Sequence, residues 1–529
     1  MTDTEKRGVI ESRLQPFIVM FEQRKFKEAL EGVNELIKVF PNSGPHYGLK
    51  GDILFASNEF EEALVSYQTF SKYPRGRLYS FLKIGFISGK LGDFDRAIAN
   101  YQKALEIQPN HIGVLNNLGN IFVKKGDYRS GIENLRKVIQ IQPEHSGAYN
   151  NLALAFKKKG NTQEAIENYQ KALYLEPKSF SILKNIGLAY LDHDEVDNSL
   201  LMLTKALEIK PKSLSVISNI AEAFKKKKNF DKAIKFLKYA KKLNNKDAQT
   251  YTSLGDVYRI QKKYKLSILY FKKSLQLEPE NAVRYNHLGV ALADSGKHGK
   301  SIDYYSRSIK LNPLDFTPLH NMGTALAKLG SHKQAISHFK KALKINSKFA
   351  EAYYGIGRSL YERAEFDKAI ENYIKALEIE PKHYQSLNSL AFAHIHLYNF
   401  QEGWKYYEYR WFGDQGKQQD WPIKKGKIWD GQKKGRIILW REQGIGDDIL
   451  FLGLVPEVAI RSTTLTVYTL KRLIPLCKSK MPGVIFKQYT GKIEEEFDYH
   501  LPMGSLPRLF RNSEKDFERT VKGYLKADP

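Results

Sequence analysis

Apolar and small residues recur along most of the chain in one repeating unit, for which residues 110–143 serve as the example. In its first half, Leu115, Leu118, Gly119 and Phe122 follow the i, i+3, i+4, i+7 spacing of one helix face. A second apolar stretch follows and ends at Pro143. Because proline cannot continue a helix, the pattern predicts two antiparallel helices in each unit, the second ending at the proline.

The position of Pro143, the closing slot of the unit, and three further positions recur along the chain at the same spacing. The closing slot is occupied by Pro109, Pro143, Pro177, Pro211, Asn245, Pro279, Pro313, Ser347 and Pro381. Small residues occupy a slot in the first half of the unit: Gly85, Gly119, Ala153, Gly187, Ala221, Gly255, Gly289, Gly323, Gly357 and Ala391. Small residues also occupy a slot in the second half: Ala97, Gly131, Ala165, Ser199, Ala233, Ser267, Ser301, Ala335 and Ala369. Aromatic rings stand shortly before the closing slot in many units: Tyr101, Tyr169, Phe271, Tyr305, Phe339 and Tyr373. We expect the small residues to let paired helices approach and the rings to fill the space beside them.

This pattern closely resembles that of tetratricopeptide repeats. The resemblance implies a mainly α-helical solenoid, a superhelix of stacked helix pairs, over residues 1–412. We expect about eleven repeats, the first of them irregular, and a closing helix pair. The region that follows is of another kind, because the repeat period stops at Gly413.

One polar slot lies two positions before the small residue of each first helix. Asparagine fills it in five units, at Asn117, Asn151, Asn185, Asn219 and Asn321. At about 100° per residue, Asn117 lies about 160° away from Leu115 and Gly119, so it faces away from the packed stripe. A carboxamide both donates and accepts hydrogen bonds, so it can pair with a peptide backbone whatever its sequence.

Two interpretations of these asparagines stay open. Either they form a ladder that binds peptides along the groove, or asparagine is merely tolerated on the surface of such repeats. The ladder resembles that in the repeat region of protein O-linked N-acetylglucosamine transferases, which holds substrate peptides. That resemblance implies peptides or proteins as partners in the concave groove.

Composition narrows the class of protein. The formal net charge is +26, but the lysines fall on repeated solvent-facing slots, so we attribute the charge to solvated helix faces and expect no nucleic-acid partner. The chain contains no uncharged apolar stretch long enough to span a membrane, so we expect no membrane span. The N-terminus also lacks the apolar run of a signal peptide. The single cysteine, Cys477, excludes an internal disulfide and is typical of a reducing cytoplasm, where we expect this protein.

The pattern changes beyond the repeats. Residues 413–434 are rich in glycine, glutamine and lysine and predict a linker. Residues 435–529 alternate apolar strands with short helices, which predicts a small parallel α/β domain. The strands are expected at 436–440, 465–468, 484–488 and 497–501, with helices beginning near Ile449 and spanning 471–478.

A glycine-rich turn, with Gly444 and Gly446, joins the first strand to the first helix. Such turns lie at the carboxyl edge of a parallel sheet, and the free amides of the helix suit phosphate. A dinucleotide fingerprint is excluded, because its third glycine is replaced by Ile449 and no acidic residue follows the second strand. The lone histidines His394 and His396 lie two apart on a helix and point to different sides, and we expect no metal.

Another family matches this region better. Trp429-Asp430-Gly431, the stretch 442–448 and the stretch 497–507 look like the glycosyltransferase region fused to tetratricopeptide repeats in many bacterial proteins. That region is similar to heptosyltransferases of the GT-B fold, so the resemblance implies a Rossmann-like half domain and a nucleotide sugar as donor, with no covalently bound cofactor.

The resemblance also assigns roles to residues. The aspartate of the Gly-Asp pair in heptosyltransferases activates the acceptor hydroxyl, and Asp447 is the matching position. Asp448 follows it in the same loop, and either aspartate could instead only cap the helix. His500 and Ser505 are weaker candidates for lining the cleft.

Two functions therefore remain. One is protein or glycan glycosylation, in which the groove delivers a polypeptide and Asp447 serves the α/β domain. The other is a non-catalytic scaffold that binds partner proteins and retains a vestigial α/β domain. Residues 435–529 suffice for only the first half of a GT-B pair, so we expect this chain to be incomplete as a transferase. Gly453 also stands where relatives often carry an arginine.

Overall fold

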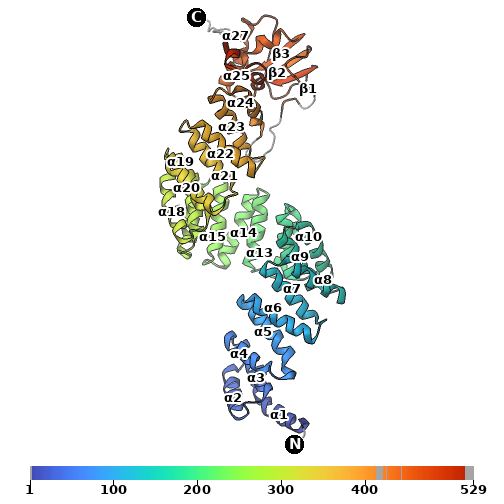
Figure 1. The fold of residues 1–529 in the computed structure, drawn as a ribbon. Coiled ribbons are helices and arrows are strands. Elements are labelled where there is room, and N and C mark those ends of the chain that lie inside the picture. The colour runs from blue at the N-terminus through green and yellow to red at the C-terminus, as the bar shows by residue number, and fades with distance from the viewer. Residues whose placement is uncertain (1–2, 413–420, 424–425, 443, 519–529) are drawn as a thin grey trace. The chain divides into compact units, whose positions relative to one another are not determined.

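A computed structural model of the protein describes residues 3–412, 421–423, 426–442 and 444–518. The chain divides into two compact units, residues 1–253 and 254–529. Both consist of successive antiparallel helix pairs, and the second unit ends in a domain built on a sheet (Figure 1).

The helices of the first unit confirm the predicted pairing. They are α1 (Asp3–Glu22), α2 (Phe26–Val39), α3 (Gly44–Ala56), α4 (Phe60–Phe70), α5 (Arg77–Leu91), α6 (Phe94–Ile107), α7 (Ile112–Lys125), α8 (Tyr128–Ile141), α9 (Ser146–Lys159), α10 (Thr162–Leu175), α11 (Phe180–Asp192), α12 (Val196–Ile209), α13 (Leu214–Lys226) and α14 (Phe230–Leu243). Helix α15 (Ala248–Ile260) contains the boundary between the units.

The second unit continues the same alternation. Its further helices are α16 (Tyr264–Leu277), α17 (Ala282–Asp294), α18 (His298–Leu311), α19 (Phe316–Lys328), α20 (His332–Ile345), α21 (Ala350–Tyr361), α22 (Phe366–Ile379), α23 (Tyr384–His396) and α24 (Phe400–Tyr407). A short 3-10 helix, η2 (Glu408–Trp411), follows α24.

Small residues and aromatic rings meet within several pairs as predicted. A Cβ atom added to Gly289 would lie 2.5 Å from Cε1 of Tyr305, and one added to Gly357 would lie 2.6 Å from Cε1 of Tyr373. Both rings are almost fully buried. At Gly289 and Gly357 a larger side chain would therefore have to displace a packed ring.

Local signals set the turn between the helices of a pair. Gly126 ends α7 in the left-handed region with φ of +94°, which other residues rarely adopt. Asp127 then caps α8 by accepting a hydrogen bond from the backbone N–H of Ser130 at 3.1 Å.

The first helices of successive pairs also contact one another. In the first unit α7 packs against both α5 and α9, and in the second unit α19 and α23 both pack against α21. Such direct contacts are less extensive between second helices, so the first helices form the inner wall of each unit. The predicted amide slot lies on this wall.

The C-terminal domain is a parallel sheet with strands in the order β1-β5-β2-β3-β4. The strands are β1 (Lys427–Ile428), β2 (Arg436–Trp440), β3 (Thr464–Thr469), β4 (Ile485–Gln488) and β5 (Tyr499–Pro502). Its helices are α25 (Ile445–Leu452), α26 (Val455–Ala459), α27 (Ile474–Lys478), α28 (Leu506–Phe510) and α29 (Glu514–Glu518), with 3-10 turns η3 (Lys471–Leu473) and η4 (Met503–Ser505). The predicted parallel α/β alternation is confirmed.

The closing helix pair shares one hydrophobic core with the sheet domain. Tyr407 of α24 belongs to the same buried cluster as Trp429, Leu439 and Leu506. The indole N–H of Trp404 donates to the backbone carbonyl of Arg511 at 2.6 Å. The predicted linker, residues 413–434, lies partly outside the described residues, and its described part contributes β1 and Trp429 to the domain.

A buried ion pair joins the two parts at this junction. Arg410 binds Glu442 through two bonds, Nε to Oε2 at 2.6 Å and Nη2 to Oε1 at 2.9 Å. Their side chains are only 4% and 2% exposed, and the backbone N–H of Gly504 donates a further bond to Glu442 at 2.7 Å. Burial raises the pKa of the Glu442 carboxyl, whereas Arg410 acts to lower it.

Candidate functional site

Amides on the inner wall bind one another between repeats. The side-chain N–H of Asn151 donates to Oδ1 of Asn116 at 3.0 Å, and that of Asn185 donates to Oδ1 of Asn150 at the same distance. In the second unit Asn321 donates to Oδ1 of Asn286, also at 3.0 Å. Each of these slot residues thus reaches the residue one position before the slot in the preceding repeat.

The other two asparagines of the predicted set, Asn117 and Asn219, are also half-buried on first helices. Asn117 contacts the hydroxyl of the buried Tyr101, whose pKa is raised to about 12, mainly by burial. The slot residues are therefore less exposed than the helical projection predicts, because neighbouring first helices cover their flanks. The sequence prediction missed the partner positions, although they recur with the same period: Asn116, Asn150 and Asn286.

Each bridging carboxamide keeps unused capacity. An asparagine side chain offers two N–H donors and an oxygen with two lone pairs. The bond from Asn185 to Asn150 uses one of these donors. The wall therefore combines bridged amides with donors and acceptors that the bridges themselves do not use.

The glycine-rich turn of the sheet domain lies at the carboxyl end of β2. Gly444 precedes α25 with φ of −72°, and a Cβ atom added to Gly446 would meet no atom within 4 Å. Packing therefore does not require glycine at Gly446. Asp447 accepts a hydrogen bond from the backbone N–H of Gly444 at 3.1 Å, which is the geometry of a helix cap.

Asp448 was predicted to lie in the loop after the first strand, but its side chain is buried inside the domain. Its carboxylate is 2% exposed, pairs with Nε of Arg441 at 2.7 Å and accepts a bond from Thr469 Oγ1 at 3.3 Å. Burial raises the pKa of this carboxyl, while Arg441 acts to lower it. Asp448 thus connects α25 to the ends of β2 and β3 inside the domain.

His500 and Ser505 are both buried. His500 is buried beneath Trp421 and accepts a hydrogen bond from the indole N–H of Trp440 at 3.3 Å, and burial lowers its pKa. Ser505 is buried at the junction, where it accepts from Arg410 at 3.0 Å and donates to Glu408 at 3.1 Å. His500 lies in β5 and Ser505 in the turn after it, but the sequence could not show that aromatic rings and η2 cover them.

The described ranges contain no group of three or more histidine, cysteine, aspartate or glutamate side chains that could hold a metal ion. None of their helices combines the length and the apolar content that crossing a membrane requires.

Comparison with protein families identifies the repeats. Tetratricopeptide-repeat models match residues 146–179 and 314–382, and further models of the same repeat match residues 90–126, 119–160, 214–247, 248–281 and 282–313. The matched helix pairs are tetratricopeptide repeats. None of these matches reaches into the sheet domain, and no curated protein matches the chain.

Solved structures show similarity to the tetratricopeptide repeats. Tom70 of yeast is 15% identical over 74% of this chain and 96% of its own, with a TM-score of 0.44. A tetratricopeptide repeat protein of Parabacteroides merdae is 18% identical over 47% of this chain and 98% of its own, with a TM-score of 0.42. YrrB, described as having an unusual peptide-binding site, is 27% identical over 35% of this chain and 96% of its own, with a TM-score of 0.29.

Proposed function

We propose that the tetratricopeptide repeats bind a partner protein through an extended segment lying along the wall of first helices. The observation that carries this proposal is the set of amide bridges Asn151–Asn116, Asn185–Asn150 and Asn321–Asn286. Each bridge holds a carboxamide in a fixed orientation, so less side-chain entropy is lost when a peptide binds. The unused donors and acceptors of the bridges suit a peptide backbone of any sequence.

Removing the slot amides of the first unit tests this function. The triple variant Asn151→Ala, Asn185→Ala and Asn219→Ala is expected to bind an extended peptide roughly a hundredfold more weakly, if each lost pairing is worth about 1 kcal/mol. Two inter-repeat bonds are lost as well, so the free energy of unfolding should fall by about 1 kcal/mol for each. Peptides selected from a phage-displayed random library on the parent chain serve as probes, with affinity measured by fluorescence polarisation.

A matched control comes from the second helices. Asn100, Asn134 and Asn168 also recur with the period of the repeat, and each donates one side-chain bond to a backbone carbonyl in its own helix. Their triple alanine variant removes as many amides from the second helices instead of the first. Equal affinity of both triple variants for the selected peptides would refute binding along the first helices.

Glycosyl transfer is a second candidate function, supported by the open space at the N-terminus of α25. Gly446 has room beside it for a ligand atom, and Gly444 and Gly446 lie at a helix N-terminus, where anionic groups are favoured. In this proposal a nucleotide sugar is the donor and Asp447 acts as the base, released from its bond to Gly444. The protein-binding function does not depend on it.

Substitution of Asp447 tests the second candidate. If Asp447 is the base, Asp447→Asn and Asp447→Ala should both lower turnover roughly 10²–10⁴-fold. If it only caps α25, the alanine variant should lose about 1 kcal/mol of stability and neither variant should change turnover. The measurement is transfer of radiolabelled sugar from a panel of nucleoside-diphosphate sugars, alongside thermal unfolding. Absence of transfer by the parent chain would reject the candidate for this chain.

A further inference from the structure

The two faces of the parallel sheet are covered in different ways. On the first face, Leu439 and Leu501 share a buried core with residues of four helices, α25, α26, α27 and α28. On the second face, Trp440 belongs to a separate buried cluster, whose other members are Trp411, Ile423, Ile438, Tyr468 and Ile493. Parallel sheets are ordinarily covered by helices on both faces. Here residues 421–423 and the chain around Ile493, which are not helical, take that place on the second face.

Aromatic rings surround a histidine at the centre of the second face. The rings of Trp411, Trp421 and Trp440 lie in mutual contact, with centroid separations of 5.3 to 5.6 Å. His500 is 3% exposed, and its ring centroid lies 6.0 Å from that of Trp421 and 5.6 Å from that of Phe497. We call these four rings around His500 the aromatic box. Because Nδ1 of His500 accepts a hydrogen bond from Trp440, this nitrogen carries no proton in the closed box.

The aromatic box offers no counter-charge to a protonated His500. The charged and titratable groups on the surrounding elements are bound to one another: Arg436 to Asp498 and Glu496, Lys487 and Tyr468 to Glu495, Arg441 to Asp448, and Arg410 to Glu442 and Glu408. Lys427 of β1 is exposed. Burial lowers the pKa of His500. A proton on this ring would therefore create a buried charge without a partner, which is costly.

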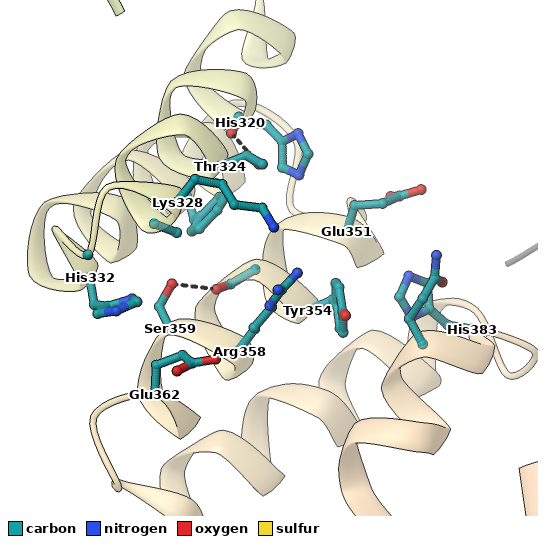
Figure 2. A pocket seen from close by; sticks show the side chains of 15 residues that line it. His320, Thr324, Lys328, His332, Glu351, Tyr354, Arg358, Ser359, Glu362 and His383 are labelled. Atoms are coloured by element: carbon teal, nitrogen blue, oxygen red, sulfur yellow. Dashed lines mark hydrogen bonds between the residues drawn. The ribbon is translucent and has the colours of Figure 1, made fainter. Parts of the chain in front are cut away.

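Three other histidines of the second unit lie in a different environment. His320, His332 and His383 line a pocket of about 490 Å³ that also contains side chains of both charges, among them Glu351 (Figure 2). Glu351 acts to raise the pKa of His320, against the effect of burial. The pocket thus provides a carboxylate near a protonated ring, whereas the aromatic box provides none for His500.

Two indole N–H groups weaken the closed state of the box. Nε1 of Trp411 and Nε1 of Trp421 are buried without a hydrogen-bond partner in the described part of the chain. A buried donor that has lost its bonds to water and gained none in return costs free energy. Opening of the box would return both donors to water, so the closed state is less stable than its ring contacts alone indicate.

We propose that His500 is a pH-sensitive latch: when Nδ1 takes up a proton, residues 421–423 leave the second face of the sheet and the tryptophan rings become exposed. Protonation turns Nδ1 from an acceptor into a donor, so its bond with the N–H of Trp440 is lost. The first face keeps its helices, because its core lies on the other side of β2 and β5. The inference depends neither on peptide binding nor on glycosyl transfer.

The pH range of opening follows from the burial of His500. Its pKa is lower in the closed box than in an exposed histidine, for which it is about 6.5. The open state therefore binds the proton more readily than the closed state. The stability of the closed box is complete above about pH 6.5 and falls as the pH decreases from there toward the pKa of the buried ring.

Tryptophan fluorescence of the full chain tests this latch. All five tryptophans of the chain lie between residues 404 and 440, so the signal comes from this region alone. Between pH 7 and pH 5, emission should shift to longer wavelength and quenching by acrylamide should increase, with a midpoint below about pH 6.5. Helix content, measured by circular dichroism, should stay constant over this range. His500→Gln should remove the shift, because the glutamine oxygen can accept from Trp440 and takes up no proton.

His394→Gln is the matched control. Burial also lowers the pKa of His394, which lies in α23 outside the aromatic box, so this variant should keep the shift of the parent. Trp421→Phe leaves His500 in place and should keep the midpoint while reducing the amplitude of the shift. The latch would be overturned by an unchanged emission of the parent down to pH 5, by a shift that persists in His500→Gln, or by a loss of helix content at the same pH.

Discussion

Replacing Arg410 with methionine is expected to destabilise the second unit by about 3–5 kcal/mol, the usual cost of leaving a buried charge without its partner. Glu442 would remain in a site where its side chain is 2% exposed, with the backbone N–H of Gly504 as its remaining charge-stabilising contact. Methionine fills much of the volume of arginine, so the loss should come from the charge and its hydrogen bonds. Chemical denaturation monitored by tryptophan fluorescence measures it.

The pH dependence of this loss identifies its cause. Burial raises the pKa of Glu442, and removing Arg410 takes away the main group that lowers it. In this variant the pKa of the Glu442 carboxyl is higher in the folded state than in the unfolded state. The variant is therefore stable while this carboxyl is protonated, and it loses stability as the pH rises from the unfolded pKa through the folded pKa. The difference from the parent should therefore be smaller at acid pH. Arg410→Met combined with Glu442→Leu should recover much of the stability at neutral pH. If the loss of stability did not depend on pH, and if Glu442→Leu did not relieve it, the ion-pair explanation would be wrong.

Gly187→Trp is expected to destabilise the first unit by about 1–3 kcal/mol or more. An added Cβ atom alone would lie 2.8 Å from Cγ of Leu203, and Leu203 is fully buried between α11 and α12. The ring of tryptophan could fit only if the helices separated. Thermal unfolding followed by circular dichroism measures the change.

Gly299→Trp supplies the comparison for this substitution. Gly299 is an exposed helical glycine, and an added Cβ atom there would meet nothing within 4 Å. It should change stability little. Similar melting temperatures for Gly187→Trp and the parent would mean that the inner contact between α11 and α12 is not as tight as the distances indicate.

Periodicity was sufficient to predict the helix pairs and the contacts inside them. The slots of Gly289 and Tyr305 lie on consecutive helices, and they meet because each pair folds back at a fixed position in the repeat. The parallel sheet was predicted from the alternation of apolar strands, such as Ile437 to Trp440, with short helices. Strand β1 escaped prediction because it is very short and lies in a polar stretch.

The candidate sites depended more on contacts between distant residues. A helical projection identifies which way Asn151 points, but its partner Asn116 belongs to the previous repeat and is set by the stacking of α7 on α9. Similarly, the resemblance to glycosyltransferases could not show that Asp448 is buried against Arg441.

The core shared by α24 and the sheet domain has a consequence for solubility. A stack of repeats leaves the apolar face of its last helix pair uncovered, so such arrays need a terminal cap with a polar outer surface. Here Trp404 and Tyr407 of that last pair are covered by Leu506, Leu509 and the carbonyl of Arg511. The sheet domain is thus the C-terminal cap of the array. This covering role does not depend on whether the domain binds a sugar.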